Sequence, residues 1–212
     1  MSAHKSQYIE RYNTAERLNH WVTAITFILL ILSGFSLFHP ALFWLTNLFG
    51  GGPWTRILHP FIGVVMFGSF ASLALRFWHH NILSKNDIQW LKQIPDVIQN
   101  FEDRLPEVDR YNAGQKLLFW TMIATIPTLF ITGIIIWQPW FTPWFPRNVD
   151  RFAVLLHALC AFIMSTGIIV HVYAAIWVKG TMRAMVRGTV ERAWVKKHHP
   201  GWYKRLEQGR DH

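Results

Sequence analysis

Residues 152–178 read FAVLLHALCAFIMSTGIIVHVYAAIWV, a run of twenty-seven residues without a charged side chain. A helix of this length can cross a bilayer, whose hydrocarbon core needs about 20 mostly apolar residues. His157 and His171 lie fourteen residues apart within the run. At ~100° per residue, fourteen steps end about 40° short of four full turns, so both imidazoles face one side, ~21 Å apart along the axis. The stretch therefore predicts a membrane helix that presents two metal ligands at different depths.

Three further charge-free stretches run from Leu18 to Thr55, from Ile57 to Leu75 and from Leu117 to Pro146. The first is too long for one span, and its Pro and Gly residues divide it into a helix and a loop. The chain is also 51% hydrophobic. We therefore expect an all-α, integral membrane four-helix bundle forming a single domain over residues 1–212. Its helices are expected near 19–39, 54–77, 114–138 and 151–178, with a connecting loop at 79–111 and a basic tail at 179–212. Helix-like apolar spacing also occurs within the loop, between residues 87 and 101.

The distribution of Lys and Arg predicts how the bundle is oriented. Residues 1–17, 76–116 and 179–212 would share one side of the membrane, and they contain eighteen of the twenty-one basic residues. The other side has only Arg56, Arg147 and Arg151. Cytoplasmic loops carry the excess of basic residues, so both termini are expected in the cytoplasm. The polar first seventeen residues do not read as a cleaved signal peptide. The net charge of +9 then reflects membrane topology and lipid contact rather than nucleic-acid binding.

Four histidines pair by depth in this arrangement. His20 lies near the cytoplasmic face, His59 and His157 lie near the outer face, and His171 lies toward the cytoplasm. Depth thus pairs His59 with His157 and His20 with His171. A lone membrane histidine can instead hydrogen-bond to a neighbouring helix, but two such pairs favour axial ligation of haem iron. We expect two haem b groups, with these four histidines as metal ligands.

Small residues accompany the histidines. Gly34, Gly63 and Gly167 lie on the expected helices, at or within about a turn of the expected haem positions. They leave room either for a flat cofactor or for close packing of helices.

Missing residue types narrow the function further. None of the four expected spans contains Asp or Glu, whereas ion-coupled transporters and proton pumps usually carry carboxylates within the membrane. The single cysteine, Cys160, excludes an intramolecular disulfide, a Cys-ligated iron–sulfur cluster and covalent attachment of c-type haem. The chain can therefore hold haem and transfer electrons, but it carries no catalytic residues of its own and needs an external electron donor.

Seven short segments together resemble the cytochrome b (gamma) subunit of membrane-bound respiratory formate dehydrogenase. The resemblance runs in order from about residue 11 to residue 205. The segments are Asn19–Trp21, Ile57–Phe61, Tyr111–Lys116, Leu156–Ala158, Val170–Tyr173, Trp177–Gly180 and Lys196–Pro200.

This resemblance implies a complete electron path. Members of the family anchor an iron–sulfur (beta) subunit and a molybdenum or tungsten catalytic (alpha) subunit to the bacterial inner membrane. Electrons from formate enter a periplasmic haem held by His59 and His157. They pass to a cytoplasmic haem held by His20 and His171, and they reduce menaquinone, which contributes to the proton-motive force of anaerobic respiration. The family also implies a trimer of heterotrimers in contact with membrane lipid.

The resemblance further places the quinone beside Asn112, Gly114 and Gln115, at the start of the third span. Amide and backbone donors at a helix N-terminus suit a quinone carbonyl. Asn112 is equally well explained as a helix N-cap. His79, His80 and Asp109 are candidates for a proton route to this site.

Three classes of protein stay open at this stage. The first is the formate dehydrogenase subunit. The second is the equivalent di-haem anchor of another oxidoreductase, such as a nickel–iron hydrogenase or a thiosulfate reductase. The third is a haem-free structural anchor or transporter, which the paired histidines and the carboxylate-free spans disfavour.

Overall fold

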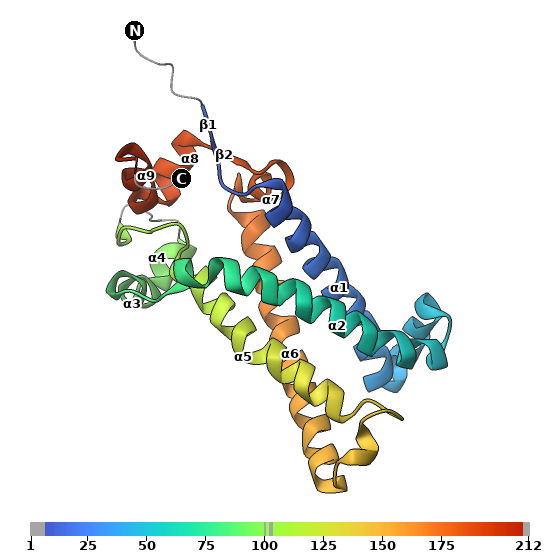
Figure 1. Cartoon of the computed structure of the whole chain (residues 1–212). Coiled ribbons are helices and arrows are strands. Elements are labelled where there is room, and N and C mark those ends of the chain that lie inside the picture. The colour runs from blue at the N-terminus through green and yellow to red at the C-terminus, as the bar shows by residue number, and fades with distance from the viewer. Residues whose placement is uncertain (1–6, 100, 102–103, 210–212) are drawn as a thin grey trace. The chain divides into compact units, whose positions relative to one another are not determined.

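Four long helices form most of the protein in the computed structural model, which describes residues 7–99, 101 and 104–209 (Figure 1). They are α1 (Thr14–Phe38), α2 (Gly52–Phe77), α5 (Ala113–Ile135) and α6 (Arg147–Trp177). Each is long and apolar enough to cross a membrane, so the four expected helices are present as candidate membrane spans. Helices α1 and α6 begin earlier than expected, at residues 14 and 147 rather than at 19 and 151.

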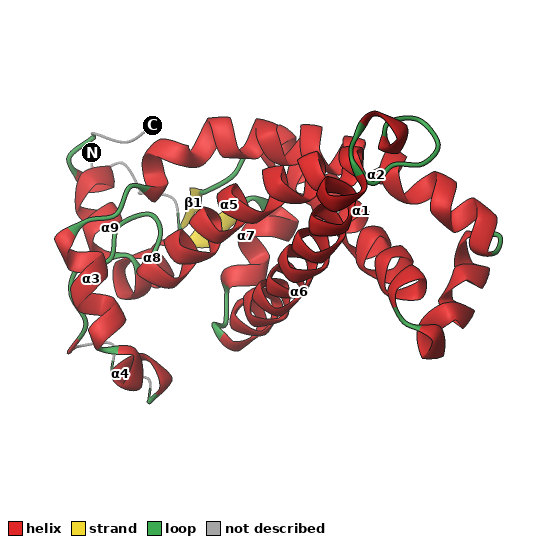
Figure 2. Ribbon diagram, turned by 90° about the horizontal axis from the view of Figure 1, so that it is seen from below, coloured by secondary structure: helices red, strands yellow, loops and turns green. Residues whose placement is uncertain are grey.

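Shorter elements fill the connections. The expected loop at 79–111 contains η2 (Trp78–Asn81), α3 (Lys85–Lys92) and α4 (Ile94–Ile98), which agrees with the helical spacing seen there. The 3-10 helices η1 (Pro40–Phe49) and η4 (Thr142–Trp144) lie in the other two connections. The tail forms α7 (Thr181–Arg187), α8 (Arg192–His198) and α9 (Pro200–Glu207). The fold is mostly helical, as predicted, but the described residues also contain a small sheet of β1 (Tyr8–Glu10) and β2 (Thr189–Glu191) (Figure 2).

The chain divides into two compact units. We call residues 18–75 and 121–169 the span unit, because they contain most of the four long helices. We call the remaining described residues the end unit: 7–17, 76–99, 101, 104–120 and 170–209.

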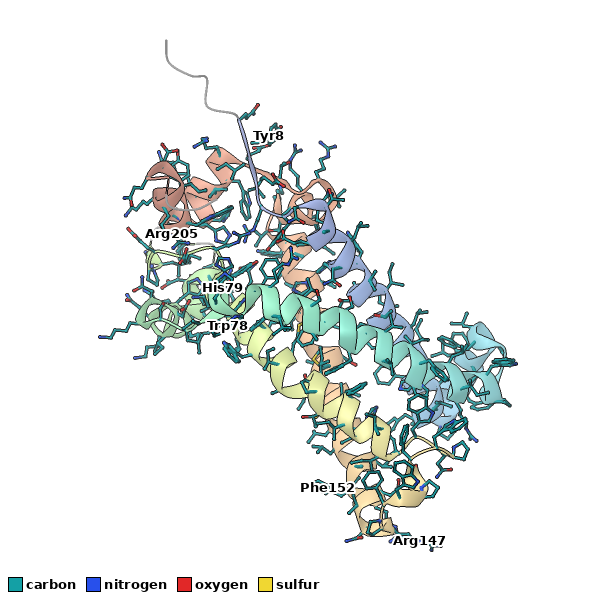
Figure 3. The ribbon with its side chains drawn as sticks, viewed as in Figure 1. Tyr8, Trp78, His79, Arg147, Phe152 and Arg205 are labelled. Atoms are coloured by element: carbon teal, nitrogen blue, oxygen red, sulfur yellow. The ribbon has the colours of Figure 1, made fainter. Side chains whose placement is uncertain are left out.

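Large apolar side chains cover the outer surface of the span unit. Leu155 and Ile169 of α6 are each 70% exposed, and Phe152 projects outward from the same helix (Figure 3). Contiguous apolar surface of this kind is unfavourable in water and is the ordinary surface of a helix in lipid. The exposure pattern therefore agrees with a multi-pass membrane protein.

Polar side chains join α1 to α2 within the span unit. The Ser69 hydroxyl donates a hydrogen bond to Asn19 Oδ1 at 2.5 Å and lies 2.7 Å from the Thr23 hydroxyl. Hydrogen bonds between membrane helices contribute to their association. These contacts fix the stretch of α1 that carries His20.

The two ends of the chain are joined in the end unit. Strands β1 and β2 pair antiparallel, with Ile9 opposite Val190. Val190, Val195 and Trp202 are almost fully buried there and form a small apolar core. Gly188 ends α7 with φ +79°, and a Cβ at this position would lie 2.5 Å from the Tyr12 carbonyl oxygen. Any larger residue would therefore push the N-terminal segment away from the tail.

A buried ion pair holds α3 against the first turns of α5, also in the end unit. Lys116 Nζ donates to Asp87 Oδ2 at 2.8 Å and to the Ile82 carbonyl at 3.1 Å. The side chains of Lys116 and Asp87 are only 6% and 8% exposed. Burial acts to raise the pKa of Asp87, but the hydrogen bonds from Lys116 and Ser84 outweigh it, and the net result is a lowered pKa. The carboxylate is therefore ionised at neutral pH.

Candidate functional site

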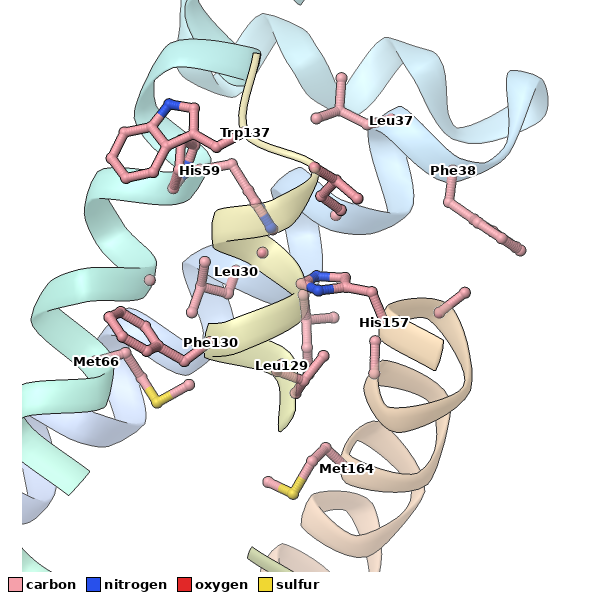
Figure 4. A pocket seen from close by; sticks show the side chains of 18 of the residues that line it. Leu30, Leu37, Phe38, His59, Met66, Leu129, Phe130, Trp137, His157 and Met164 are labelled. Carbon is pink, nitrogen blue, oxygen red and sulfur yellow. The ribbon is translucent and has the colours of Figure 1, made fainter. Parts of the chain in front are cut away.

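A cavity of about 750 Å³ lies within the span unit, lined by residues of α1, α2, α5 and α6 (Figure 4). Its walls are mostly apolar, and they include Leu30, Phe130 and Met164. His59 from α2 and His157 from α6 point into it from two sides, as Figure 4 shows, with ring centroids 6.4 Å apart. Cofactor pockets have typical volumes of ~300–1,000 Å³, with few polar groups on apolar walls. The cavity has both properties.

A hydroxyl group from a neighbouring helix holds each imidazole. Ser33 Oγ of α1 lies 2.7 Å from His59 Nδ1, and Thr132 Oγ1 of α5 lies 2.9 Å from His157 Nδ1. Both hydroxyl residues are buried, Ser33 completely. Four helices thus contribute one residue each to two matched pairs.

The hydroxyl groups also suit one tautomer of each histidine. The Ser33 hydroxyl donates its own hydrogen to the Leu29 carbonyl at 2.7 Å, and the Thr132 hydroxyl donates to the Thr128 carbonyl at 2.7 Å. A hydroxyl that keeps this bond can accept from Nδ1–H of the histidine. The tautomer with its proton on Nδ1 leaves the lone pair of Nε2 available to a metal. A hydrogen bond of this kind on the far nitrogen orients a metal-ligating histidine and raises its basicity.

Glycine follows each hydroxyl residue directly. A Cβ added at Gly34 would lie 3.4 Å from His59 Cε1, and one added at Gly133 would lie 3.5 Å from His157 Cε1. Any side chain longer than a methyl group would meet the imidazole at either position. In each pair, Ser33-Gly34 and Thr132-Gly133, the hydroxyl residue therefore orients one imidazole ring and the glycine leaves space for that ring.

This geometry fits a haem that two histidines would hold. Two imidazoles bonded to one metal through nitrogens at ~2 Å have ring centroids ~6 Å apart, close to the separation of His59 and His157. Within residues 7–99, 101 and 104–209, no three His, Cys, Asp or Glu side chains cluster as ligands for a bare metal ion. A metal between these two rings needs its other ligands from a cofactor, and the porphyrin of haem provides them.

The other two expected ligands lie in different units. His20 is on α1 in the span unit, and His171 is on the last turns of α6 in the end unit. Their pairing stays a prediction.

The three expected quinone residues lie together at the start of α5, in the end unit. Asn112 and Gln115 form a reciprocal capping box. The backbone N–H of Asn112 donates to Gln115 Oε1 at 3.0 Å, and the backbone N–H of Gln115 donates to Asn112 Oδ1 at 2.9 Å. Asn112 thus caps the N-terminus of α5, as one of the two interpretations predicted. Only the side-chain oxygens take part, so the NH₂ groups of both side chains keep their hydrogens available. Gly114 lies beneath Trp90 of α3, since a Cβ there would be 3.5 Å from the indole ring.

Asp109, one of the candidates for a proton route, is tied to Arg205 by an ion pair. Burial acts to raise the pKa of this carboxyl group, but the Arg205 guanidinium and a backbone hydrogen bond lower it overall. Asp109 therefore stays ionised near neutral pH and is a poor proton donor. The rings of His79 and His80, which are neighbours in sequence, have centroids 4.0 Å apart and are tilted by 45°, and their role stays a prediction.

The fold and the paired imidazoles fit a membrane cytochrome b, and sequence comparison assigns the chain to that class. Residues 11–188 match the family described as prokaryotic cytochrome b561. The chain is 47% identical to the formate dehydrogenase cytochrome b556(fdo) subunit of Escherichia coli K12, over 94% of each protein. It is 45% identical to the nitrate-inducible cytochrome b556(Fdn) subunit of the same organism, over 96% of this chain and 94% of the relative. It is also 44% identical to the formate dehydrogenase cytochrome b556 subunit of Haemophilus influenzae, over 92% of this chain and 82% of the relative.

The chain therefore belongs to the family of formate dehydrogenase cytochrome b556 subunits. This confirms the resemblance inferred from the seven segments, and membership implies a b-type haem.

Sequence reasoning missed four residues that the structure adds to the site: Ser33, Thr132, Gly133 and Arg56. The first three belong to a repeated pair, a hydroxyl residue followed by glycine, but Thr166-Gly167 on a third span has the same pattern, so the sequence alone does not single them out. Arg56 lines the cavity one turn before His59 and is the only Arg, Lys, Asp or Glu among its lining residues.

We expect loss of either hydroxyl to weaken haem binding without abolishing it. Ser33→Ala or Thr132→Val removes the acceptor for Nδ1–H, and the loss of such a partner typically costs ~10–100-fold in affinity for the metal group. Transfer of haem to an excess of an apo-haem protein would measure this. Thr128→Val is the matched control, because the Thr128 hydroxyl bonds only to the Ala124 carbonyl. Equal retention of haem in Thr132→Val and Thr128→Val would contradict the assigned role.

Proposed function

We propose that this chain is the di-haem cytochrome b subunit that anchors a membrane-bound formate dehydrogenase and passes its electrons to menaquinone. One observation carries the proposal: two imidazoles 6.4 Å apart, each with its Nδ1 within hydrogen-bond distance of a hydroxyl oxygen, project into an apolar cavity within membrane-length helices. The relatives described above are all formate dehydrogenase subunits, which supports formate as the source of the electrons.

His59 and His157 would hold the haem nearer the outer surface. When bound, the haem supplies a carrier for one electron at a time at this depth. The chain orients the two ligands through Ser33 and Thr132, and the apolar walls exclude water. Arg56 is well placed to pair with a haem propionate, because it is the only Arg, Lys, Asp or Glu lining the cavity and is exposed at the start of α2.

Neutralising Arg56 is expected to lower the midpoint potential of the outer haem. A positive charge near the iron favours the reduced state, and its loss at a partly screened site corresponds to roughly tens of millivolts. Arg56→Lys keeps the positive charge and should change the midpoint potential little. Arg56→Gln removes the charge and should show the full decrease in a redox titration followed by visible absorption. Arg147→Gln is the control, because Arg147 lies on the same unit but does not line the cavity (Figure 3). An unchanged potential in Arg56→Gln would remove this residue from the site.

His20 and His171 would hold the second haem, nearer the cytoplasm. The excess of Lys and Arg at both ends of the chain supports cytoplasmic termini and a location in the bacterial inner membrane. Electrons would then arrive on the periplasmic side, from an iron–sulfur subunit that receives them from a molybdenum or tungsten catalytic subunit. Assembly as a trimer of such heterotrimers is part of the same proposal.

The quinone would bind at the first turn of α5. The capping box uses the oxygens of Asn112 and Gln115 and leaves their NH₂ groups as donors for a quinone carbonyl. The ion pair of Lys116 with Asp87 holds α3 beside this turn. The cap thus orients the two amide groups, and both roles of Asn112 can coexist.

Conservative substitutions separate the quinone role from the capping role. Asn112→Ser and Gln115→Glu keep a side chain that can cap the helix, but they remove the NH₂ donors. We expect each to raise the apparent KM for quinone several-fold, since one hydrogen bond contributes ~1 kcal/mol, while the melting temperature stays unchanged. Asn112→Ala should additionally cost about 1 kcal/mol of stability. Normal quinone kinetics in both conservative variants would show that Asn112 and Gln115 cap the helix and do not bind the quinone.

Purification of the intact complex tests the function itself. A tagged chain should bring down an iron–sulfur subunit and a formate-oxidising subunit, and formate should reduce its haem absorption bands. The alternative of a hydrogenase anchor predicts reduction by hydrogen and none by formate. The haem-free alternative predicts no absorption bands at all.

A further inference from the structure

Two arginines meet inside the end unit, just before two membrane-length helices. Arg11 precedes α1 and is 5% exposed, while Arg110 precedes α5 and is partly buried. Each donates to the main chain of the other: Arg11 Nη2 to the Arg110 carbonyl at 2.8 Å, and Arg110 Nη2 to the Arg11 carbonyl at 2.7 Å. Two positive charges are thus held close together away from water.

Aromatic rings surround these charges. The Arg11 guanidinium lies 5.3 Å from the ring centroid of Trp202 and 5.3 Å from that of Trp194. The Arg110 guanidinium lies 5.6 Å from the Trp202 ring. Cation–π contacts of this kind offset part of the cost of burying a guanidinium, but they do not engage its N–H groups.

Three buried donors in this cluster have no hydrogen-bond partner: Arg11 Nη1, Arg110 Nε and Trp202 Nε1. Trp202 itself is 1% exposed. A buried donor without an acceptor is costly, and such groups are rare in native proteins. These three donors therefore need a hydrogen-bond acceptor, and a bound molecule could provide it.

The nearby carboxylates are engaged elsewhere. Asp109 pairs with Arg205, Glu107 pairs with Lys204, and Glu16 pairs with Arg76. No described carboxylate forms an ion pair with Arg11 or Arg110. The missing partner is thus both an acceptor of several hydrogen bonds and an anion.

We propose that Arg11, Arg110 and Trp202 form a binding site for a phosphate group, carried by a membrane phospholipid or free in solution. A phosphate presents several acceptor oxygens, and paired arginines are the side chains best suited to it. Both arginines lie at the starts of membrane-length helices, the level at which phospholipid headgroups are found, and basic pockets between such helices bind headgroups.

The full chain, purified in detergent without phosphate buffer, tests the site with two probes. One arm titrates inorganic phosphate, and the other titrates short-chain phosphatidylglycerol, with binding followed by calorimetry. Saturable binding of either probe supports the proposal. Binding of the lipid alone identifies a headgroup site, and binding of both identifies a site open to free phosphate.

Two tryptophans provide a matched pair of variants. Trp202→Phe keeps an aromatic ring and removes the unpaired N–H, so it should weaken binding at least about tenfold. Trp194→Phe makes the same change at the same distance from Arg11, but the Trp194 N–H already donates to the Lys179 carbonyl at 2.8 Å. It should leave the Kd of the bound probe unchanged.

A thermal melt without ligand shows whether each variant is folded. Arg11→Lys is a second test, because it keeps the charge and loses the planar guanidinium donor; it too should weaken binding about tenfold. Failure of both probes to bind the wild type, or an equal loss of binding in Trp194→Phe and Trp202→Phe, would overturn the proposal.

Discussion

His157→Ala should leave one haem per chain, where we expect two in the wild-type subunit. The substitution removes one of the two imidazoles whose ring centroids lie 6.4 Å apart, and His59 would then be the only one of the pair left to hold the haem. His59→Ala should give the same result. The double variant should also retain one haem, because both residues serve one group. Haem content per chain, together with reduced-minus-oxidised spectra, measures all three.

His39→Ala is the matched control for these variants. His39 lies outside the cavity, where its Nδ1 accepts a hydrogen bond from the Ala41 N–H and caps η1. It should keep both haems. Loss of both haems in the double variant, with one lost in each single variant, would show that His59 and His157 bind different haems.

Lys116→Met is expected to destabilise the end unit by about 3–5 kcal/mol, because removing one partner of a buried ion pair leaves an uncompensated charge. The remaining carboxylate of Asp87 is only 8% exposed. The pKa of Asp87 is lowered in the folded state. The pair therefore contributes to stability at pH values above the pKa of this group in the unfolded chain, and the contribution is lost as the pH falls through its pKa in the folded protein. Thermal unfolding in detergent at neutral pH gives the measurement.

Lys116→Met with Asp87→Asn should recover part of this loss, since no buried charge remains. Lys85→Met, at an exposed lysine of α3, should change the melting temperature little. Equal melting temperatures for Lys116→Met and Lys85→Met would show that the pair does not hold α3 against α5.

The lengths of the uncharged stretches predicted the four long helices, because a helix that crosses a bilayer needs about 20 mostly apolar residues. The order of the spans and the excess of Lys and Arg likewise predict which end of each helix lies outside, and hence the depth of each histidine. These two constraints were enough to match His59 with His157, which the structure brings together in one cavity. The same reasoning pairs His20 with His171, and that pair is still a prediction.

Contacts between side chains of different helices could not be predicted in this way. Ser33 and Thr132 look like ordinary helix residues until the rotation of α1 and α5 turns their hydroxyl groups toward the imidazoles. The pairing of β1 with β2 was also missed, because each strand has three residues and their partners are far apart in sequence. Asn112 shows a different limit: the sequence allowed both a cap and a quinone donor, and the structure shows the cap while leaving the NH₂ group available.

The most direct test of the two-haem account is the ratio of haem to protein in the purified chain. A pyridine haemochrome assay, combined with quantitative amino-acid analysis, should give two haem b per chain and no haem attached covalently. It should give one haem for His157→Ala. A ratio of one or zero in the wild-type chain would contradict the account.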